Sequence, residues 1–215
     1  MTFLYLHGFA SGPGSKKARY FRDRLAQHGI ELQIPDLADG DFEHLTITGQ
    51  LNVIERTANG RPIALIGSSL GGYLAALYAS RHAAVERLVL MAPAFSFARR
   101  WAETLGPKKV RAWRRTGSMA VFHYNDNRVR HLGYQLAEDA ARYPDFASFT
   151  QPALIFHGSR DTVVPSFLSE QFAQEHSNAR VRILDSDHEL IDVLEPMWQE
   201  TAEFLQIQKQ PLPGR

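Results

Sequence analysis

Short runs of hydrophobic residues recur along the chain, and several of them are continuous rather than alternating with polar residues. Continuous apolar runs of this length are typical of strands buried on both faces of a parallel sheet, so they predict a mostly parallel sheet of about six strands. The runs are Phe3 to Leu6, Leu32 to Ile34, Ile63 to Ile66, Leu88 to Met91, Ala153 to Phe156 and Val181 to Leu184.

Segments with the spacing of amphipathic helices fill most of the intervals between these runs. The regular alternation of strands and helices indicates an α/β fold with helices on both faces of the sheet. The expected helices are Lys16 to His28, Leu45 to Thr57, Leu70 to Arg81, Ser166 to His176 and Leu190 to Ile207.

One interval breaks this alternation. Between Met91 and Ala153 lie about 60 residues, far more than a single crossover helix needs. We expect residues 96–150 to form a helical cap, or lid, inserted over the carboxyl edge of the sheet within one domain that spans residues 1–215. Ligands bind at that edge in open α/β sheets.

Composition narrows the class of protein. The chain has 215 residues, of which 44% are hydrophobic and 22% charged, as in ordinary globular proteins, and its net charge of +1 gives no reason to expect nucleic acid. The absence of cysteine excludes disulfides, thiolate metal sites and cysteine nucleophiles, and it fits a cytoplasmic protein. We expect neither a membrane span nor a signal peptide, and the end from Gln206 to Arg215 should fray.

The most informative motif runs from Gly67 to Gly71, with the sequence Gly-Ser-Ser-Leu-Gly. It follows an apolar strand and precedes a helical stretch, which is the context in which G-x-S-x-G forms a nucleophile elbow. The two glycines leave room for a sharp, strained turn that presents Ser69 at a helix N-terminus, where negative charge is favoured. We therefore interpret Ser69 as a nucleophile, against the alternative of a simple tight turn.

A serine nucleophile needs a base and a group that orients the base. In this arrangement the acid and then the histidine follow the serine along the chain. Asp161 lies in a polar turn just after the strand Ala153 to Phe156, where the alternative role is a turn cap, and His188 lies in the loop after the last strand.

The other histidines and acids fit this role less well. Asp185 and Asp187 are interpreted as loop and cap residues. His7 and His157 each precede a glycine at a strand end and are interpreted as loop-shaping residues near the site. The remaining histidines lie on expected helices, at a helix end or in the insertion: His28, His44, His82, His123, His131 and His176.

An oxyanion hole would need two backbone N–H groups, one from the residue after the nucleophile and one from the loop after the first strand. These positions are Leu70 and Phe9. The glycine-rich loop from Gly8 to Lys17 also invites interpretation as a phosphate cradle, but it lacks the Gly-Lys-Ser/Thr step of a P-loop. No spacing of histidines and acids suggests a metal site, and no cofactor is implied.

The insertion holds a strongly basic stretch between Ser96 and Arg115. The plain interpretation is a solvated helix face, whereas the alternative is a positive rim that attracts anionic substrates. If the stretch is a solvated helix face, Trp101 and Trp113 anchor a lid to the sheet. If it is a positive rim, they line a slot for the acyl chain. The basic residues, against the single acid Glu103, are Arg99, Arg100, Lys108, Lys109, Arg111, Arg114 and Arg115.

Taken together, these motifs resemble the α/β-hydrolase superfamily in its own chain order. They are His7-Gly8-Phe9, Gly67 to Gly72, His157 to Asp161 with Val164-Pro165, and Asp187-His188. The opening Leu4 to Phe9, with Ser11 and Gly14 to Ala18, resembles the small bacterial YqiA-like esterases. The resemblance implies an α/β-hydrolase fold and a serine esterase whose catalytic triad is Ser69, Asp161 and His188.

The sequence therefore predicts a cofactor-free carboxylesterase that cleaves a small or medium acyl ester through an acyl-enzyme on Ser69. His7 is a further candidate for substrate binding, with Trp101 and Trp113. A thioesterase, for example one acting on acyl-CoA, and hydrolysis of amides or carbon–carbon bonds would use the same residues. A non-catalytic binding protein on the same fold is the alternative from another class. The protein is expected to be a monomer or a homodimer.

Overall fold

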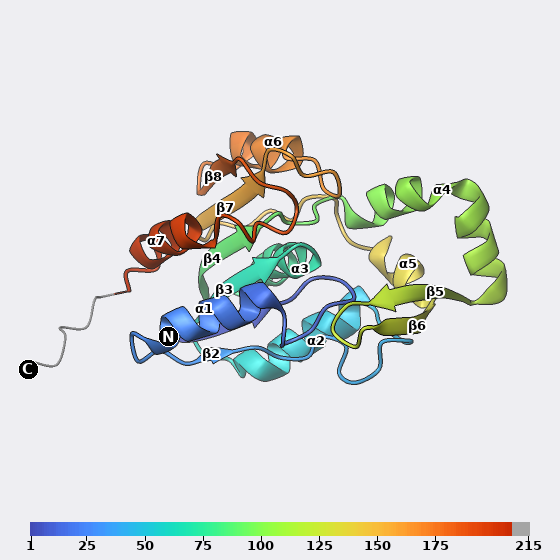
Figure 1. Cartoon of the computed structure of the whole chain (residues 1–215), viewed down its shortest axis with the longest axis horizontal. Helices are drawn as coiled ribbons and strands as arrows, with labels where there is room; N and C mark the ends of the chain where they lie inside the picture. The colour runs from blue at the N-terminus through green and yellow to red at the C-terminus, as the bar shows by residue number, and fades with distance from the viewer. Residues whose placement is uncertain (208–215) are drawn as a thin grey trace, which may run out of the picture.

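The computed structural model describes residues 1–207 and shows a six-stranded parallel sheet covered by helices on both faces (Figure 1). The sheet order is β2-β1-β3-β4-β7-β8. The strands are β1 (Thr2–Leu6), β2 (Leu32–Gln33), β3 (Ile63–Ser68), β4 (Val85–Met91), β7 (Ala153–Gly158) and β8 (Ala179–Leu184). Every apolar run that predicted a strand overlaps one of these six, although β2 ends one residue before Ile34.

The helices of the main layers also lie where the periodicity predicts them. They are α1 (Lys16–Ala26), α2 (Ile47–Ala58), α3 (Leu70–Ala79), α6 (Phe167–Glu175) and α7 (Leu194–Phe204). The last one begins four residues later than expected, because residues before it form a loop in which Leu190 has a φ of 55°. The expected fraying of the chain end falls mainly on residues 208–215, which lie outside the described residues.

Alternate residues of the strands pack into two separate hydrophobic cores, because successive side chains of a strand point to opposite faces of the sheet. Leu4 and Leu6 of β1 pack with α2, α3 and α6, whereas Tyr5 between them packs against Phe21 of α1 and the apolar face of α7. The sheet is therefore buried on both faces, which explains why its strands have continuous apolar sequences.

The order of the strands creates a switch point between β1 and β3. The chain steps from β1 to β2 on one side and then crosses to β3 and β4 on the other. Loops that follow β1 and β3 consequently leave the sheet in opposite directions and open a crevice at its carboxyl edge. Phe9 and Ser69 lie in these two loops, and Asp161 and His188 follow β7 and β8 at the same edge of the sheet.

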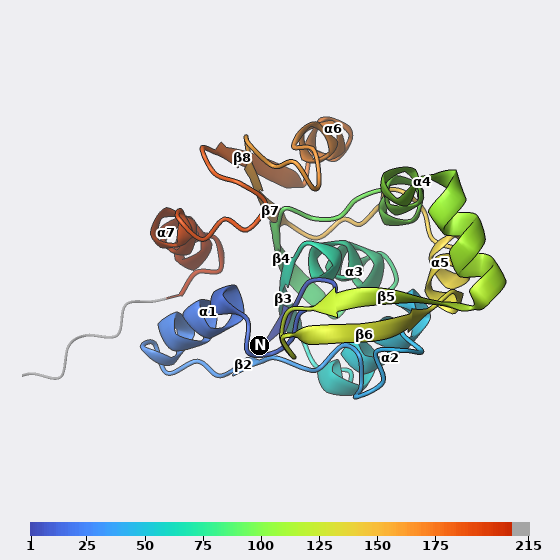
Figure 2. The ribbon, with the colours of Figure 1, turned by 45° about the vertical axis from the view of Figure 1, so that its right-hand side comes forward.

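The insertion between β4 and β7 extends to one side of the sheet (Figures 1 and 2). It contains α4 (Phe97–Thr116), the antiparallel hairpin of β5 (Ser118–His123) and β6 (Arg128–Gly133), and α5 (Gln135–Ala140). The hairpin was not expected from the sequence, which predicted a helical cap. α4 bends sharply at Gly106, whose φ is 75°, directly before Pro107.

The hairpin returns from the outer end of the insertion to the sheet (Figure 2). At its tip the Tyr124 N–H donates to the Ala10 carbonyl at 2.8 Å, in the loop after β1. Within residues 1–207, no helix is both long and apolar enough to cross a membrane.

Candidate active site

Ser69 lies at the junction of β3 and α3 in a strained backbone conformation. Its φ of 53° and ψ of −118° lie in a region that non-glycine residues rarely adopt. A Cβ on Gly67 would approach the Gly71 carbonyl oxygen to 2.5 Å, and one on Gly71 would overlap the Leu6 carbonyl. The two glycines are therefore needed for the turn, as the motif predicts.

Hydrogen bonds from three segments hold this turn in place. The Ser69 N–H donates to the Met91 carbonyl of β4 at 2.8 Å. The Ser69 carbonyl accepts from Gly72 at 2.9 Å, inside α3, and from Ala94 at 3.0 Å, after β4. The strain is thus balanced by contacts with neighbouring elements, which fix the side chain of Ser69 at the edge of the sheet.

His188 connects Ser69 to Asp161. Its Nε2 lies 3.0 Å from the Ser69 Oγ, and its Nδ1 lies 2.6 Å from the Asp161 Oδ2. The carboxylate only accepts, so Nδ1 carries the hydrogen and Nε2 is free to accept from the serine hydroxyl. This is the tautomer that a general base needs.

The side chain of Asp161 is fully buried, and its carboxylate accepts four hydrogen bonds. Oδ1 accepts from the N–H groups of Val163 and Val164, each at 2.8 Å, while Oδ2 accepts from His188 and from His157. Burial alone would raise the pKa of Asp161, but the hydrogen bonds from His157 and His188 outweigh it and hold that pKa well below its usual range. The group is therefore a permanent carboxylate.

His157 is a second histidine on the same carboxylate. Its ring is fully buried, and its Nε2 lies 3.1 Å from the Asp161 Oδ2 and 2.8 Å from the Val164 carbonyl. Both partners are acceptors, so Nε2 carries the hydrogen and Nδ1 accepts from the Ser169 hydroxyl at 2.7 Å. The sequence predicted a loop-shaping residue here; the contact with Asp161 was missed, and the four-residue spacing was its only signal.

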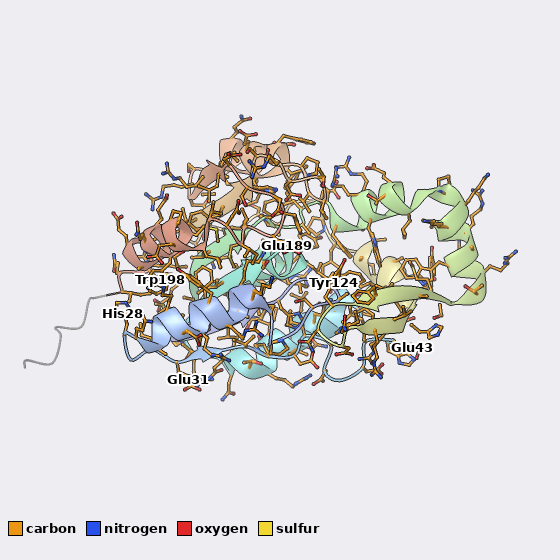
Figure 3. All side chains as sticks on the ribbon, in the orientation of Figure 1. His28, Glu31, Glu43, Tyr124, Glu189 and Trp198 are labelled. Carbon is orange, nitrogen blue, oxygen red and sulfur yellow. The ribbon has the colours of Figure 1, made fainter. Side chains whose placement is uncertain are left out.

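The loop that carries His188 is anchored on two sides. On the β7 side it packs directly over Gly158, where any Cβ would meet the Asp187 and Ser186 carbonyls. On the α1 side the Lys17 ammonium donates to the Glu189 carbonyl at 2.6 Å. Glu189, labelled in Figure 3, follows His188 directly in the chain.

Lys17 is half-buried beside this loop. Burial lowers the pKa of Lys17 to about 8, against the opposing effect of Glu189, Asp187 and Asp161. No local pattern in the sequence indicates this contact, because the two partners are 172 positions apart.

The two N–H groups predicted for an oxyanion hole come from loops that meet at Ser69. A Cβ on Gly8 would lie 3.4 Å from the Ser69 Cβ, which brings the loop after β1 against the nucleophile. Within residues 1–207 neither the Phe9 N–H nor the Leu70 N–H donates to a protein acceptor. Both donors are thus available to a ligand.

The residues predicted to bind substrate occupy different environments. His7 is buried, and its Nε2 accepts from the Leu37 N–H at 3.1 Å, so its ring stabilises the neighbouring loop. Trp113 is also buried and donates to the Leu132 carbonyl, which ties α4 to the hairpin. Trp101 is half-buried, with its ring 5.1 Å from that of Phe9. Of the three, Trp101 lies next to the predicted oxyanion donor, and its role in binding stays a prediction.

The basic residues of α4 are mostly exposed. Arg99 pairs with Asp145 at 3.0 Å, whereas none of the others pairs with a carboxylate in the described part of the chain. These others are Arg100, Lys108, Lys109, Arg111, Arg114 and Arg115. Among residues 1–207, no group of three or more histidine, aspartate or glutamate side chains is placed to hold a metal ion.

The model of the family described as Uncharacterised protein family (UPF0227) matches residues 2–206. The chain belongs to this family. The match covers every strand of the sheet and the whole insertion between β4 and β7 of this UPF0227 protein.

Solved structures with the same arrangement are α/β hydrolases. Alpha/beta hydrolase domain-containing protein 10 from mouse has a TM-score of 0.79 at 19% identity, covering 95% of this chain and 89% of that one. Est1E from Butyrivibrio proteoclasticus has a TM-score of 0.76 at 19% identity, with 95% and 86% covered. Paleococcus ferrophilus monoacylglycerol lipase has a TM-score of 0.71 at 17% identity, with 94% and 93% covered. The UPF0227 chain therefore has the α/β-hydrolase fold.

Proposed function

We propose that this protein is a serine hydrolase that cleaves a small or medium acyl ester through an acyl-enzyme on Ser69. The observation that carries the proposal is the continuous hydrogen-bonded path from the Ser69 Oγ through His188 to the buried Asp161. Nucleophile, base and orienting acid come from three separate loops at one edge of the sheet. A merely structural serine would not require a strained backbone at this position.

The first half of the reaction forms the acyl-enzyme. His188 Nε2 takes the hydroxyl proton as Ser69 Oγ attacks the acyl carbonyl carbon, and the carbonyl oxygen becomes an oxyanion. The N–H groups of Phe9 and Leu70 stabilise that oxyanion, and loss of one such donor raises the barrier by about 2.7–4 kcal/mol. The intermediate collapses, and His188 returns the proton to the leaving alcohol.

The second half releases the acid. Water attacks the acyl carbon while His188 takes its proton, and the second tetrahedral intermediate expels Ser69, which regains the proton from His188. Asp161 remains ionised throughout and stabilises the charged imidazole. No cofactor is needed for either half.

Activity-based labelling tests this proposal directly. A fluorophosphonate probe should label the protein at one residue, Ser69, and the protein should hydrolyse p-nitrophenyl esters of short and medium acyl chains. A folded protein that is neither labelled nor active on such a panel is a binding protein on this fold, and the proposal would fail.

A thioester substrate is the second candidate, and the unpaired basic residues of α4 favour it. Six basic side chains without a carboxylate partner give the cap a positive field that would attract an anionic leaving group. A parallel assay with acyl-CoA thioesters distinguishes the two substrate classes.

A further inference from the structure

The outer face of the β5–β6 hairpin is an exposed apolar surface. Phe122 and Val129 are cross-strand partners, so their side chains share one face, and they are 44% and 62% exposed. Tyr124 extends this face at the tip with 72% of its surface exposed, and its ring lies 5.3 Å from that of Phe122. Among residues 1–207, these are three of the seven large hydrophobic residues that are exposed.

The opposite face of the hairpin accounts for its position on the protein. His123 and Leu132 are buried, and Met119 and Val121 pack against the main core. The inner face thus holds the hairpin in place. Among the residues that the structure describes, Phe122 and Val129 of the outer face belong to neither hydrophobic core, so the folding of the chain does not explain their apolar side chains.

The insertion also concentrates the positive charge of the protein. Residues 97–133 contain nine lysine and arginine residues and two acids, which gives this segment a charge of +7. Since the whole chain has +1, the remainder carries −6. Lys108, Lys109, Arg111, Arg114 and Arg115 lie on the second half of α4, which leads directly into the hairpin at Gly117.

We infer that the outer face of the hairpin, together with the basic half of α4, is a docking surface for an anionic lipid bilayer. Exposed aromatic and aliphatic side chains next to lysine and arginine are the features by which peripheral proteins enter the headgroup region. A second copy of the chain is disfavoured as the occupant, because it would bring two segments of charge +7 together.

The position of the surface relates it to the candidate active site. The Tyr124 N–H bonds to the Ala10 carbonyl, next to Phe9, and a Cβ on Gly12 would overlap Asn125 at the hairpin tip. The tip therefore packs on the loop that supplies an oxyanion donor. In Figure 3, Tyr124 on the hairpin and Glu189, the residue after His188, both lie near the centre of the view. A bilayer at the hairpin would bring the hydrophobic part of an ester close to Ser69.

Vesicle sedimentation tests the inference without requiring hydrolysis, so its failure is distinct from failure of the proposed function. The full chain is mixed with vesicles of phosphatidylcholine alone or with added phosphatidylglycerol. We expect the protein to bind the anionic vesicles only. Two variants should each lower the partition coefficient about tenfold or more: the double variant Phe122→Ser, Tyr124→Ser and the triple variant Arg111→Gln, Arg114→Gln, Arg115→Gln.

The control variant is Phe167→Ser, Ile183→Ser, which removes two exposed hydrophobic residues elsewhere on the surface, at 54% and 38% exposure. It should bind like the natural protein. All variants should keep their circular dichroism, and the control and the Phe122, Tyr124 variant should hydrolyse a short soluble ester normally. Absence of binding to anionic vesicles, equal binding to neutral vesicles, or equal loss in the control would overturn the inference. So would a dimer that dissociates in the Phe122, Tyr124 variant, or binding to an oligonucleotide in place of vesicles.

Discussion

Ser68 is buried at the end of β3, whereas its neighbour Ser69 is partly exposed at the strained turn. Replacing each of them by alanine is the most direct test of the nucleophile. Ser69→Ala should lower kcat for an ester by at least about a thousandfold, because triad members act as a unit. Its thermal midpoint should stay close to that of the natural protein. Ser68→Ala is the matched control and should keep most activity, and a Ser69→Ala protein that remains active would contradict the nucleophile assignment.

His157 is the residue whose role the sequence did not reveal. Replacing it by leucine removes a donor to Asp161 Oδ2 in a fully buried site, so we expect kcat to fall about tenfold or more, with KM nearly unchanged. His157→Gln retains an N–H donor and should recover part of the loss. Equal activity of the leucine and natural proteins would show that His188 alone orients the acid.

Asp161 gives a prediction about stability and pH. Its folded-state pKa lies below the unfolded value of about 3.9, so its ionisation stabilises the fold above that pH, and this contribution is lost as the pH falls through the folded-state value. Asp161→Asn should therefore lower the free energy of unfolding at neutral pH, and the deficit should shrink at pH values below about 4. Urea titrations across that range measure the difference, and a deficit independent of pH would contradict this account.

At the scale of elements, the site depends on how the loop after β8 is anchored to α1. Lys17→Met removes the bond to the Glu189 carbonyl and should lower kcat about tenfold, because His188 loses its fixed position. Lys16→Met, on the same helix turn but exposed, is the control and should change nothing. Lys17→Arg should recover part of the activity; if the two methionine variants behave alike, the anchor has no role.

The contact between Lys17 and the Glu189 carbonyl also predicts that activity falls at alkaline pH. The groups that face the Lys17 ammonium are Glu189, Asp187 and Asp161, and its charge is present below pH about 8 and lost above it. Activity of the natural protein should fall above that pH, whereas Lys17→Met should lack this part of the profile.

Local signals predicted the sheet and the elbow because their causes are local. Strands buried on both faces need continuous apolar runs, and the turn at Ser69 needs glycine two residues to either side. The hairpin escaped prediction because β6 is mostly polar: Val129 and Leu132 are its only large apolar residues and lie on opposite faces, so neither an apolar run nor an alternation marks the strand. Lys17 acts on a group that only the folded chain brings to it, whereas His157 contacts Asp161 only four positions away, across the turn that follows β7.

At the scale of the whole molecule, the separation of charge between the insertion and the remainder makes hydrolysis sensitive to the charge of the substrate. For an anionic ester, kcat/KM should fall as salt is added, while a neutral ester of equal length should hardly respond. The triple variant Arg111→Gln, Arg114→Gln, Arg115→Gln should remove the difference. Identical salt profiles of the two esters in the natural protein would mean that these side chains only face solvent.

The positions of the site residues along the chain also bear on how the protein is made. Ser69 and His188 are 119 positions apart, and the oxyanion loop precedes both. At 5–20 residues per second, a ribosome needs on the order of ten seconds to travel from the serine codon to the histidine codon. A nascent chain therefore carries the strained elbow and the oxyanion loop well before it carries a base. The proposed hydrolysis would begin only when the last strand and its loop are in place, so its onset during translation would report completion of the sheet.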